Sequence, residues 1–267
     1  MPEMRPAGLK VKQKMITAKI NDTEVTAEEG STVLQVATKY GIYIPSLCYH
    51  EGLPAYGACR LCLVEVTQNG RSRLESSCTR PIEQGMEIRT DTAEIREHRK
   101  MIMEFLLARC PDSEAVQDMA ERAGVTETRF SKLNEECILC GLCVRACRDA
   151  IGTSAISFMN RGIKRHVDTP FSINSDVCVG CGSCAGVCPT GMIRVEDRDG
   201  KRYLKCFNTE LELMACPECG KYFTTRRFYE KNKENFIGPE GLHCLCDECR
   251  RRQHASRLKN RPAAGYR

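Results

Sequence analysis

The chain has 267 residues with 19 cysteines, no tryptophan and a formal net charge of +5. Residues 1–14 form an N-terminal extension with three lysines and no apolar run, which excludes a signal peptide or a membrane span and predicts a cytoplasmic chain. Cysteines in C-x-x-C groups in such a chain bind metal rather than form disulfides, and the basic excess is expected to balance anionic metal clusters.

Residues 15–91 predict a small mixed α/β domain. Asn21-Asp22 and Asn69-Gly70 are turn pairs between alternating segments, and the second pair is a strong hairpin signal. A helix is expected over 31–41, with Ser31 or Thr32 as its N-cap and Gly41 at its C-terminal end. The expected strands are 15–21, 24–30, 61–66 and 86–90.

The same segment holds a spaced set of four cysteines, with gaps of ten, two and fifteen residues between them. A long loop, a C-x-x-C pair and a remote ligand fit a 2Fe–2S cluster. The first gap is longer than in plant-type ferredoxins, so a structural zinc site is the alternative. The set is Cys48, Cys59, Cys62 and Cys78.

Residues 92–130 predict a helical connector. An apolar pattern indicates a helix over 92–109, with Ile95, Ile102, Phe105 and Leu106 on one face. A shorter helix is expected to end at Gly124.

Residues 131–200 contain two cysteine runs, "CILCGLCVRAC" and "CVGCGSCAGVC", each with gaps of two, two and three residues. Such a pair of runs is typical of a bacterial-type ferredoxin domain with two 4Fe–4S clusters, in which the fourth cysteine of each run ligates the other cluster. Zinc knuckles are the alternative. Pro189 follows the second run as the pattern expects, whereas Arg148 follows the first. The predicted sets are Cys137, Cys140, Cys143 and Cys188 for the first cluster, and Cys178, Cys181, Cys184 and Cys147 for the second.

Residues 201–252 predict a small domain with a four-cysteine metal site. Its two C-x-x-C pairs are typical of a zinc ribbon with two knuckles on facing turns. Cys206 and Cys244 are additional cysteines, so a third 4Fe–4S cluster is the alternative to zinc. Residues 253–267 are a basic tail without interleaved aromatic residues, which favours an acidic partner over nucleic acid. The predicted ligands are Cys216, Cys219, Cys246 and Cys249.

The stretches "PSLCYHEGLPAYGACRLCLVEV", "CILCGLCVRACRD" and "CVGCGSCAGVCPTGMI" resemble the N-terminal part of the large iron–sulfur subunit of respiratory complex I. They equally resemble the diaphorase iron–sulfur subunit of NAD-linked hydrogenases, over about residues 15–195. The resemblance implies a ubiquitin-like β-grasp fold for the 2Fe–2S domain and a ferredoxin-like fold for the 4Fe–4S domain, hence an α+β protein.

The sequence departs from that family at one place. The family usually carries a further cluster held by one histidine and three cysteines, but the connector offers only His98 and Cys110. We therefore expect this cluster to be missing, Cys110 to be a buried or free thiol, and His98 to lie on a helix surface.

No dinucleotide fingerprint or catalytic motif is visible in the sequence. The chain is expected to be an electron-transfer subunit of a hetero-oligomer, between a flavin-bearing NAD(P)(H)-reactive subunit and a further redox subunit. By resemblance, the latter belongs to a hydrogenase, a formate dehydrogenase or an electron-bifurcating complex. One alternative is an autonomous ferredoxin-like carrier, although the connector, the four-cysteine segment and the tail look like docking elements. A cluster-sensing, nucleic-acid-binding regulator is a second alternative, supported only by the basic tail and the knuckles.

Overall fold

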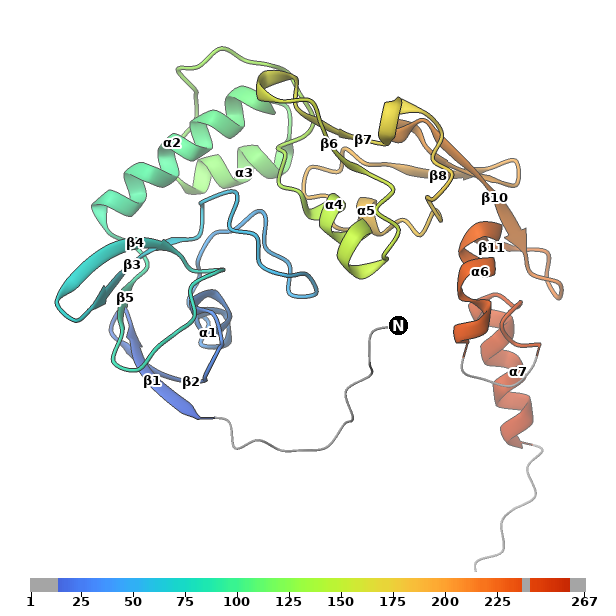
Figure 1. The fold of residues 1–267 in the computed structure, drawn as a ribbon, viewed down its shortest axis with the longest axis horizontal. Helices are drawn as coiled ribbons and strands as arrows, with labels where there is room; N and C mark the ends of the chain where they lie inside the picture. The colour runs from blue at the N-terminus through green and yellow to red at the C-terminus, as the bar shows by residue number, and fades with distance from the viewer. Residues whose placement is uncertain (1–13, 237–240, 260–267) are drawn as a thin grey trace, which may run out of the picture. The chain divides into compact units, whose positions relative to one another are not determined.

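The structure, a computed structural model, describes residues 14–236 and 241–259. It consists of two compact units, Met1–Cys140 and Gly141–Arg267, so their border lies inside the first 4Fe–4S cysteine run. Figure 1 shows the elements of each unit in chain order. The predicted N-terminal extension and the end of the basic tail fall on residues 1–13 and 260–267, outside the described residues.

The first unit contains a five-stranded mixed sheet with the strand order β2-β1-β5-β3-β4. Neighbouring strands are antiparallel except for β1 and β5, which are parallel. The helix α1 packs on this sheet, since its apolar side chains share one core with those of the strands. The elements are β1 (Met15–Ile20), β2 (Thr23–Glu28), α1 (Val33–Lys39), β3 (Leu63–Gln68), β4 (Arg71–Ser76) and β5 (Glu87–Arg89).

Local sequence signals explain this sheet and its helix. Asn69 and Gly70 both have positive φ, of 52° and 73°, which is the conformation that a tight two-residue hairpin requires. Thr32 caps α1 through a capping box: its side chain accepts from the amide of Gln35, and the side chain of Gln35 accepts from the amide of Thr32. The predicted hairpin and helix start are both confirmed.

Two helices follow the sheet, α2 (Ala93–Arg109) and α3 (Glu114–Arg122). The prediction that Phe105 lies on the buried face of the first helix is wrong, because its side chain is 52% exposed. At 3.6 residues per turn, the buried stripe runs through Ile95, Met103 and Leu107, and position 105 lies beyond its edge. Phe105 instead stacks on Phe130, with the ring centroids 4.5 Å apart.

The two helices enclose a second apolar core, which we call the connector core. It is formed by Met103 and Leu107 of α2, Val116 of α3 and the residues Leu47, Leu61, Cys110, Ala120, Val125 and Ile138. Cys59 and Cys140, which belong to two different predicted ligand sets, both pack against this core.

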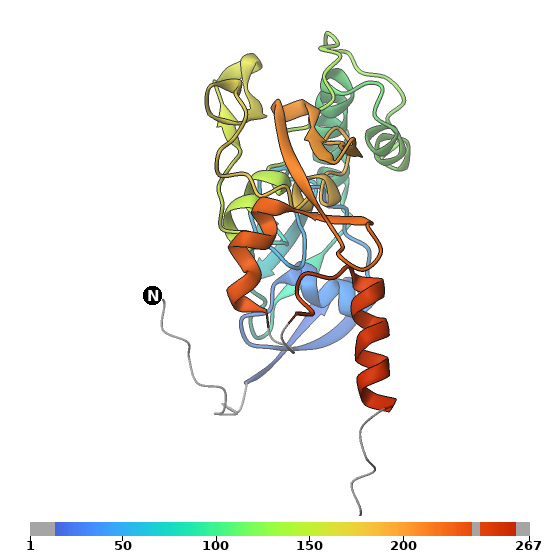
Figure 2. The same cartoon turned by 90° about the vertical axis from the view of Figure 1, so that its right-hand side faces the viewer.

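The second unit begins with the short helix α4 (Leu142–Arg145), which continues into a π-helical turn at Ala146–Ala150. Its main sheet is antiparallel, with the order β11-β10-β9-β8, and α6 leaves the end of β11 directly (Figures 1 and 2). The remaining elements are β6 (Ser157–Met159), β7 (His166–Asp168), α5 (Ser183–Gly186), β8 (Val195–Arg198), β9 (Lys201–Leu204), β10 (Thr209–Ala215), β11 (Tyr222–Thr225), α6 (Arg226–Asn232) and α7 (Asp247–Lys259).

Among the described residues, no helix combines the length and the apolar character that crossing a lipid bilayer requires.

Candidate iron–sulfur and metal sites

The structure brings the four cysteines of the predicted 2Fe–2S set together. Cys48 and Cys59 come from the long loop between α1 and β3, where the amide of Cys59 donates to Cys48 Sγ at 3.4 Å. Cys62 precedes β3 and Cys78 follows β4, and β3 and β4 pair as a hairpin. The thiols of Cys62 and Cys78 are hydrogen-bonded to each other, which lowers the pKa of the Cys62 thiol.

Burial supports the use of this set as a cluster site. Cys48, Cys62 and Cys78 are each 1% exposed. The pKa of Cys59 is raised above its ordinary value by its hydrogen bond with Cys48 and by burial. Thiolates held this close together repel one another unless a cation lies between them, and iron binds the thiolate form, so this donor set of three buried cysteines and the half-buried Cys59 fits a cluster.

Arg99 is a residue of this site that the sequence did not reveal. From α2, its Nε donates to the carbonyl of Leu61 at 3.0 Å and its Nη2 donates to the carbonyl of Leu63 at 2.9 Å. These carbonyls flank Cys62, so the guanidinium ties the connector to the loop that carries this ligand. Burial lowers the pKa of Arg99, as expected for a cation drawn into the protein.

The second 4Fe–4S set also comes together, around a small cavity. Cys178, Cys181 and Cys184 line this cavity from one cysteine run, and Cys147 lines it from the preceding run. Burial raises the pKa of Cys178, and it raises that of Cys184 to about 12. Four cysteines from both runs thus line one cavity, and that the fourth cysteine of one run serves the cluster of the other stays a prediction.

The π-helical turn at Ala146–Ala150 places Cys147 in this cavity. The amide of Ala155 donates to Cys147 Sγ at 3.2 Å, and the hydroxyl of Thr153 lies 3.1 Å from the same sulfur. The amide of Ile151 donates to the carbonyl of Ala146, five residues back. Such turns are frequent at functional sites, because they redirect a side chain without ending the helix.

The first 4Fe–4S set, Cys137, Cys140, Cys143 and Cys188, includes residues of both units, and its assembly stays a prediction from the sequence. Within the first unit, Arg109 Nε donates to the carbonyl of Cys137 at 2.6 Å. Within the second unit, burial opposes ionisation of Cys188, but the amides of Ile193, Thr190 and Met192 and the hydroxyl of Thr190 together lower its pKa.

The four cysteines of the predicted C-terminal metal site form a tight group, which we call the four-cysteine group. Their sulfur atoms all lie within 4.8 Å of one another, and those of Cys219 and Cys246 are 3.7 Å apart. Zn–S bonds of about 2.3 Å in a tetrahedron give sulfur–sulfur distances of about 3.8 Å. This geometry fits a single ion better than a cubane, whose ligands must span a whole cluster.

The two pairs of this group differ in their local structure. Cys216 and Cys219 lie in the turn between β10 and β11, as a knuckle should. Cys246 and Cys249 lie at the start of α7, so the second pair is built on a helix rather than on a second hairpin. Burial opposes ionisation of Cys216, but the amides of Cys246, Cys219 and Glu218 lower its pKa to about 6.

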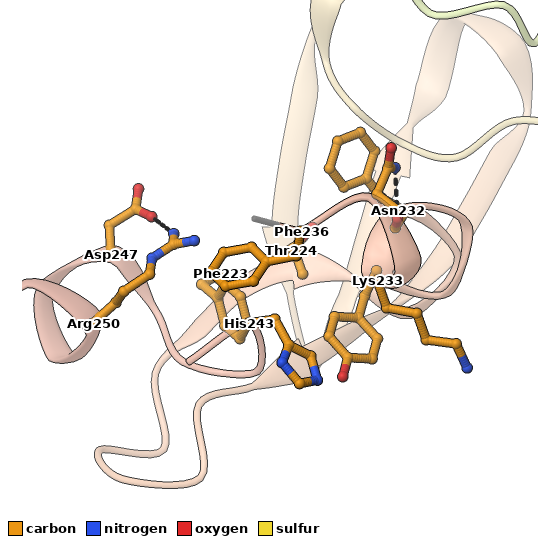
Figure 3. A pocket seen from close by; sticks show the side chains of 10 residues that line it. Phe223, Thr224, Asn232, Lys233, Phe236, His243, Asp247 and Arg250 are labelled. Atoms are coloured by element: carbon orange, nitrogen blue, oxygen red, sulfur yellow. Dashed lines mark hydrogen bonds and ion pairs between the residues drawn. The ribbon is translucent and has the colours of Figure 1, made fainter. Parts of the chain in front are cut away.

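Few apolar side chains surround the four-cysteine group. Phe223 and Phe236 pack against its small core, and beside them lies a cavity of about 280 Å³ with aromatic walls. Figure 3 shows this cavity, with the ring of His243 near its centre and the Arg250–Asp247 ion pair at one side. A core this small cannot hold the segment folded alone, which fits a structural role for the cysteines.

The remaining candidates lie apart from these groups. Cys110 is fully buried in the connector core, and burial raises its pKa to about 12. His98 is exposed on α2, with its Nδ1 2.8 Å from the carbonyl of Glu94 on the same helix. Burial raises the pKa of Cys206 to about 11, and Cys244 donates to the carbonyl of Gly241. In the described part of the chain, Cys110 and His98 do not form a histidine–cysteine metal group.

Two family models match the chain. Residues 13–93 match a 2Fe-2S iron-sulfur cluster binding domain, and residues 136–192 match a 4Fe-4S dicluster domain. The chain therefore contains both domains in the order that the cysteine spacing predicts.

Among curated proteins, the chain is 32% identical over 234 residues to the second G subunit of NADH-quinone oxidoreductase of Rhizobium meliloti, a match that covers 77% of this chain and 27% of the relative. It is 31% identical over 211 residues to the HndD subunit of the NADP-reducing hydrogenase of Solidesulfovibrio fructosivorans. That match covers 67% of this chain and 36% of the relative. The chain thus spans about a quarter to a third of the length of these relatives.

Among solved structures, a chain of an NAD+-reducing NiFe hydrogenase in the H2-reduced state matches with a TM-score of 0.52 and 30% identity. That match covers 58% of this chain and 74% of the hydrogenase chain.

Proposed function

We infer that the chain belongs to the family of iron–sulfur subunits that includes the G subunits of NADH-quinone oxidoreductase and subunits of NAD(P)-reducing hydrogenases. From this membership we propose that it passes single electrons between a flavin-bearing, NAD(P)(H)-reactive subunit and a partner redox enzyme of the hydrogenase, formate dehydrogenase or electron-bifurcating class. We place it in the cytoplasm, where thiolate ligands stay reduced.

The observation that carries this proposal is the clustering of buried and half-buried thiols at the predicted positions. Cys48, Cys59, Cys62 and Cys78 would hold a 2Fe–2S cluster, and the crossed sets would hold two 4Fe–4S clusters. Bound clusters of these types supply one-electron transfer. The chain's own residues bury or half-bury the ligands and donate amide hydrogen bonds to the sulfur atoms of Cys48, Cys147 and Cys178.

We further propose zinc as the occupant of the four-cysteine group. The short sulfur–sulfur distances support one tetrahedral ion, and four thiolates without an open position fit a structural rather than a catalytic site. The metal would fold the segment from the β10–β11 hairpin to α7.

The electron-transfer function is tested with the chain purified anaerobically from its host, with its bound partners. This complex is expected to contain flavin, and its cluster absorbance is expected to bleach when NADH or NADPH is added. The same chain freed of partners is expected to bleach with dithionite only. Bleaching of the partner-free chain by NADH would contradict the proposal, and so would a native preparation that elutes as a monomer without flavin.

The metal content provides an independent prediction. Two 4Fe–4S clusters and one 2Fe–2S cluster require about ten irons per chain, and the four-cysteine group requires about one zinc. Both are measured by elemental analysis of the anaerobic protein. About fourteen irons without zinc would mean a third 4Fe–4S cluster in the four-cysteine group, and about eleven irons without zinc would mean a single iron there.

A further inference from the structure

The loop of the second 4Fe–4S site is held by three side chains from the C-terminal sheet region. Its consecutive carbonyls, those of Cys178, Val179 and Gly180, each accept a hydrogen bond from a different side chain. Arg227 Nη1 donates to Cys178 at 2.9 Å, Thr225 Oγ1 donates to Val179 at 2.5 Å, and Arg202 Nη1 donates to Gly180 at 2.7 Å. We call Arg202, Thr225 and Arg227 the loop clamp.

Peptide geometry links the loop clamp to the cluster ligands. In a trans peptide the C=O of one residue and the N–H of the next point in opposite directions. When the carbonyls of residues 178–180 are held by the clamp, the amides of residues 179–181 are directed to the other side of the loop. One of these amides donates a hydrogen bond to a ligand sulfur: the amide of Gly180 donates to Cys178 Sγ at 3.4 Å.

Glycine at position 180 makes this close approach possible. Its φ is +66°, and an added Cβ would lie 2.7 Å from Leu211 Cδ1 and 2.8 Å from Thr225 Cγ2. Both distances are too short for real contacts, so a side chain at this position would push the loop away from the sheet. The loop therefore rests directly on β10 and the end of β11.

The clamp residues come from the part of the chain beyond the dicluster match, which ends at residue 192. Arg202 lies on β9, Thr225 ends β11, and Arg227 lies in the first turn of α6. Thr225 is fully buried, and its hydroxyl also accepts from the amide of Phe228 at the start of α6. The clamp is thus a property of the C-terminal segment and not of the ferredoxin domain alone.

Arg202 and Arg227 differ in whether a carboxylate neutralises their positive charge. Arg202 forms a two-point ion pair with Asp197, with N–O distances of 2.8 and 2.7 Å. Arg227 donates to the carbonyls of Ser175 and Cys178, and in the described part of the chain no carboxylate pairs with it. A cation and inward-pointing amides both stabilise the more negative, reduced state of a nearby cluster, and hydrogen bonds to sulfur are determinants of cluster potential.

We propose that Arg202, Thr225 and Arg227 are positioning residues that hold the loop 178–181 and raise the reduction potential of the second 4Fe–4S cluster. This inference rests on the proposed function in one respect, the assignment of Cys147, Cys178, Cys181 and Cys184 to that cluster.

The test uses the full chain purified anaerobically, with potentials measured by EPR-monitored redox titration. In the R202Q/R227Q double variant, one of the two 4Fe–4S potentials is expected to become more negative. The expected change is about tenfold in the ratio of reduced to oxidised cluster, or about 59 mV for one electron. The other 4Fe–4S potential and the 2Fe–2S potential should not change. R226Q is the matched control, because Arg226 is the neighbouring exposed arginine and pairs with Glu212.

A second variant gives a shift of opposite sign. In D197N the carboxylate that compensates Arg202 is removed, while the amide keeps a similar shape, so the same potential should become more positive. This result would support the clamp even if the double variant loses its second cluster. Unchanged potential in D197N, or equal shifts in R226Q and the double variant, would overturn it. If the wild-type chain itself contains only about six irons, the proposed ligand assignment fails instead of the clamp.

Discussion

Replacing Cys147 with serine is expected to remove the second 4Fe–4S cluster, although Cys147 lies in the first cysteine run. Its sulfur lines the same cavity as Cys178, Cys181 and Cys184, and the π-helical turn directs it there. Serine is a poor ligand for iron in a cluster, so the iron content should fall from about ten to about six per chain. Elemental analysis and EPR of the reduced protein measure this loss.

The identity of the 4Fe–4S cluster that each variant retains tests the crossed assignment more sharply than the fall in iron content does. C147S and C178S should retain the same 4Fe–4S cluster, recognised by a common midpoint potential, whereas C188S should retain the other one. Cys206→Ser is the control, because Cys206 is a half-buried cysteine of the same unit that does not line the cavity. If C147S and C188S kept the same cluster, the crossed assignment would be wrong.

Replacing Cys246 with serine is expected to release the metal of the four-cysteine group and to unfold the segment around it. Binding of structural zinc is worth about 10–16 kcal/mol, which is comparable to the whole stability of a typical domain. The small core around Cys216, Leu242 and Leu245 cannot replace that energy. Zinc should fall from about one per chain to near zero, and α7 should become a site of rapid proteolytic cleavage.

Cys244→Ser is the matched control for this experiment. Cys244 lies two residues before Cys246 but outside the four-cysteine group, and its thiol donates to the carbonyl of Gly241. The control should keep its zinc and its protease resistance. A C246S chain with full zinc content, or one with normal protease resistance after zinc loss, would contradict a folding role for the metal.

Local signals in the sequence were sufficient to predict several elements of the fold. The Asn69-Gly70 turn and the Thr32 cap each depend on the conformational preference of one or two residues, and both are present in the structure. Cysteine spacing predicted both iron–sulfur domains, because a cluster constrains its ligands over a few residues of chain.

Contacts between distant segments could not be predicted in this way. Arg99 reaches carbonyls 36 and 38 residues away, and Arg227 reaches a carbonyl 49 residues away. Nothing in the neighbouring sequence distinguishes these arginines from those that make no such long-range contact. Phe105 was misplaced for a related reason: an apolar period gives the width of a helix face only approximately, and the packing of α3 decides where that face is centred.

The connector core also affects how charge can move inside the first unit. Cys59 and Cys140 border the same packing of apolar side chains. An apolar medium has few dipoles that must turn when a charge crosses it. An electron that tunnels between centres anchored at these two cysteines would therefore meet a low reorganisation barrier.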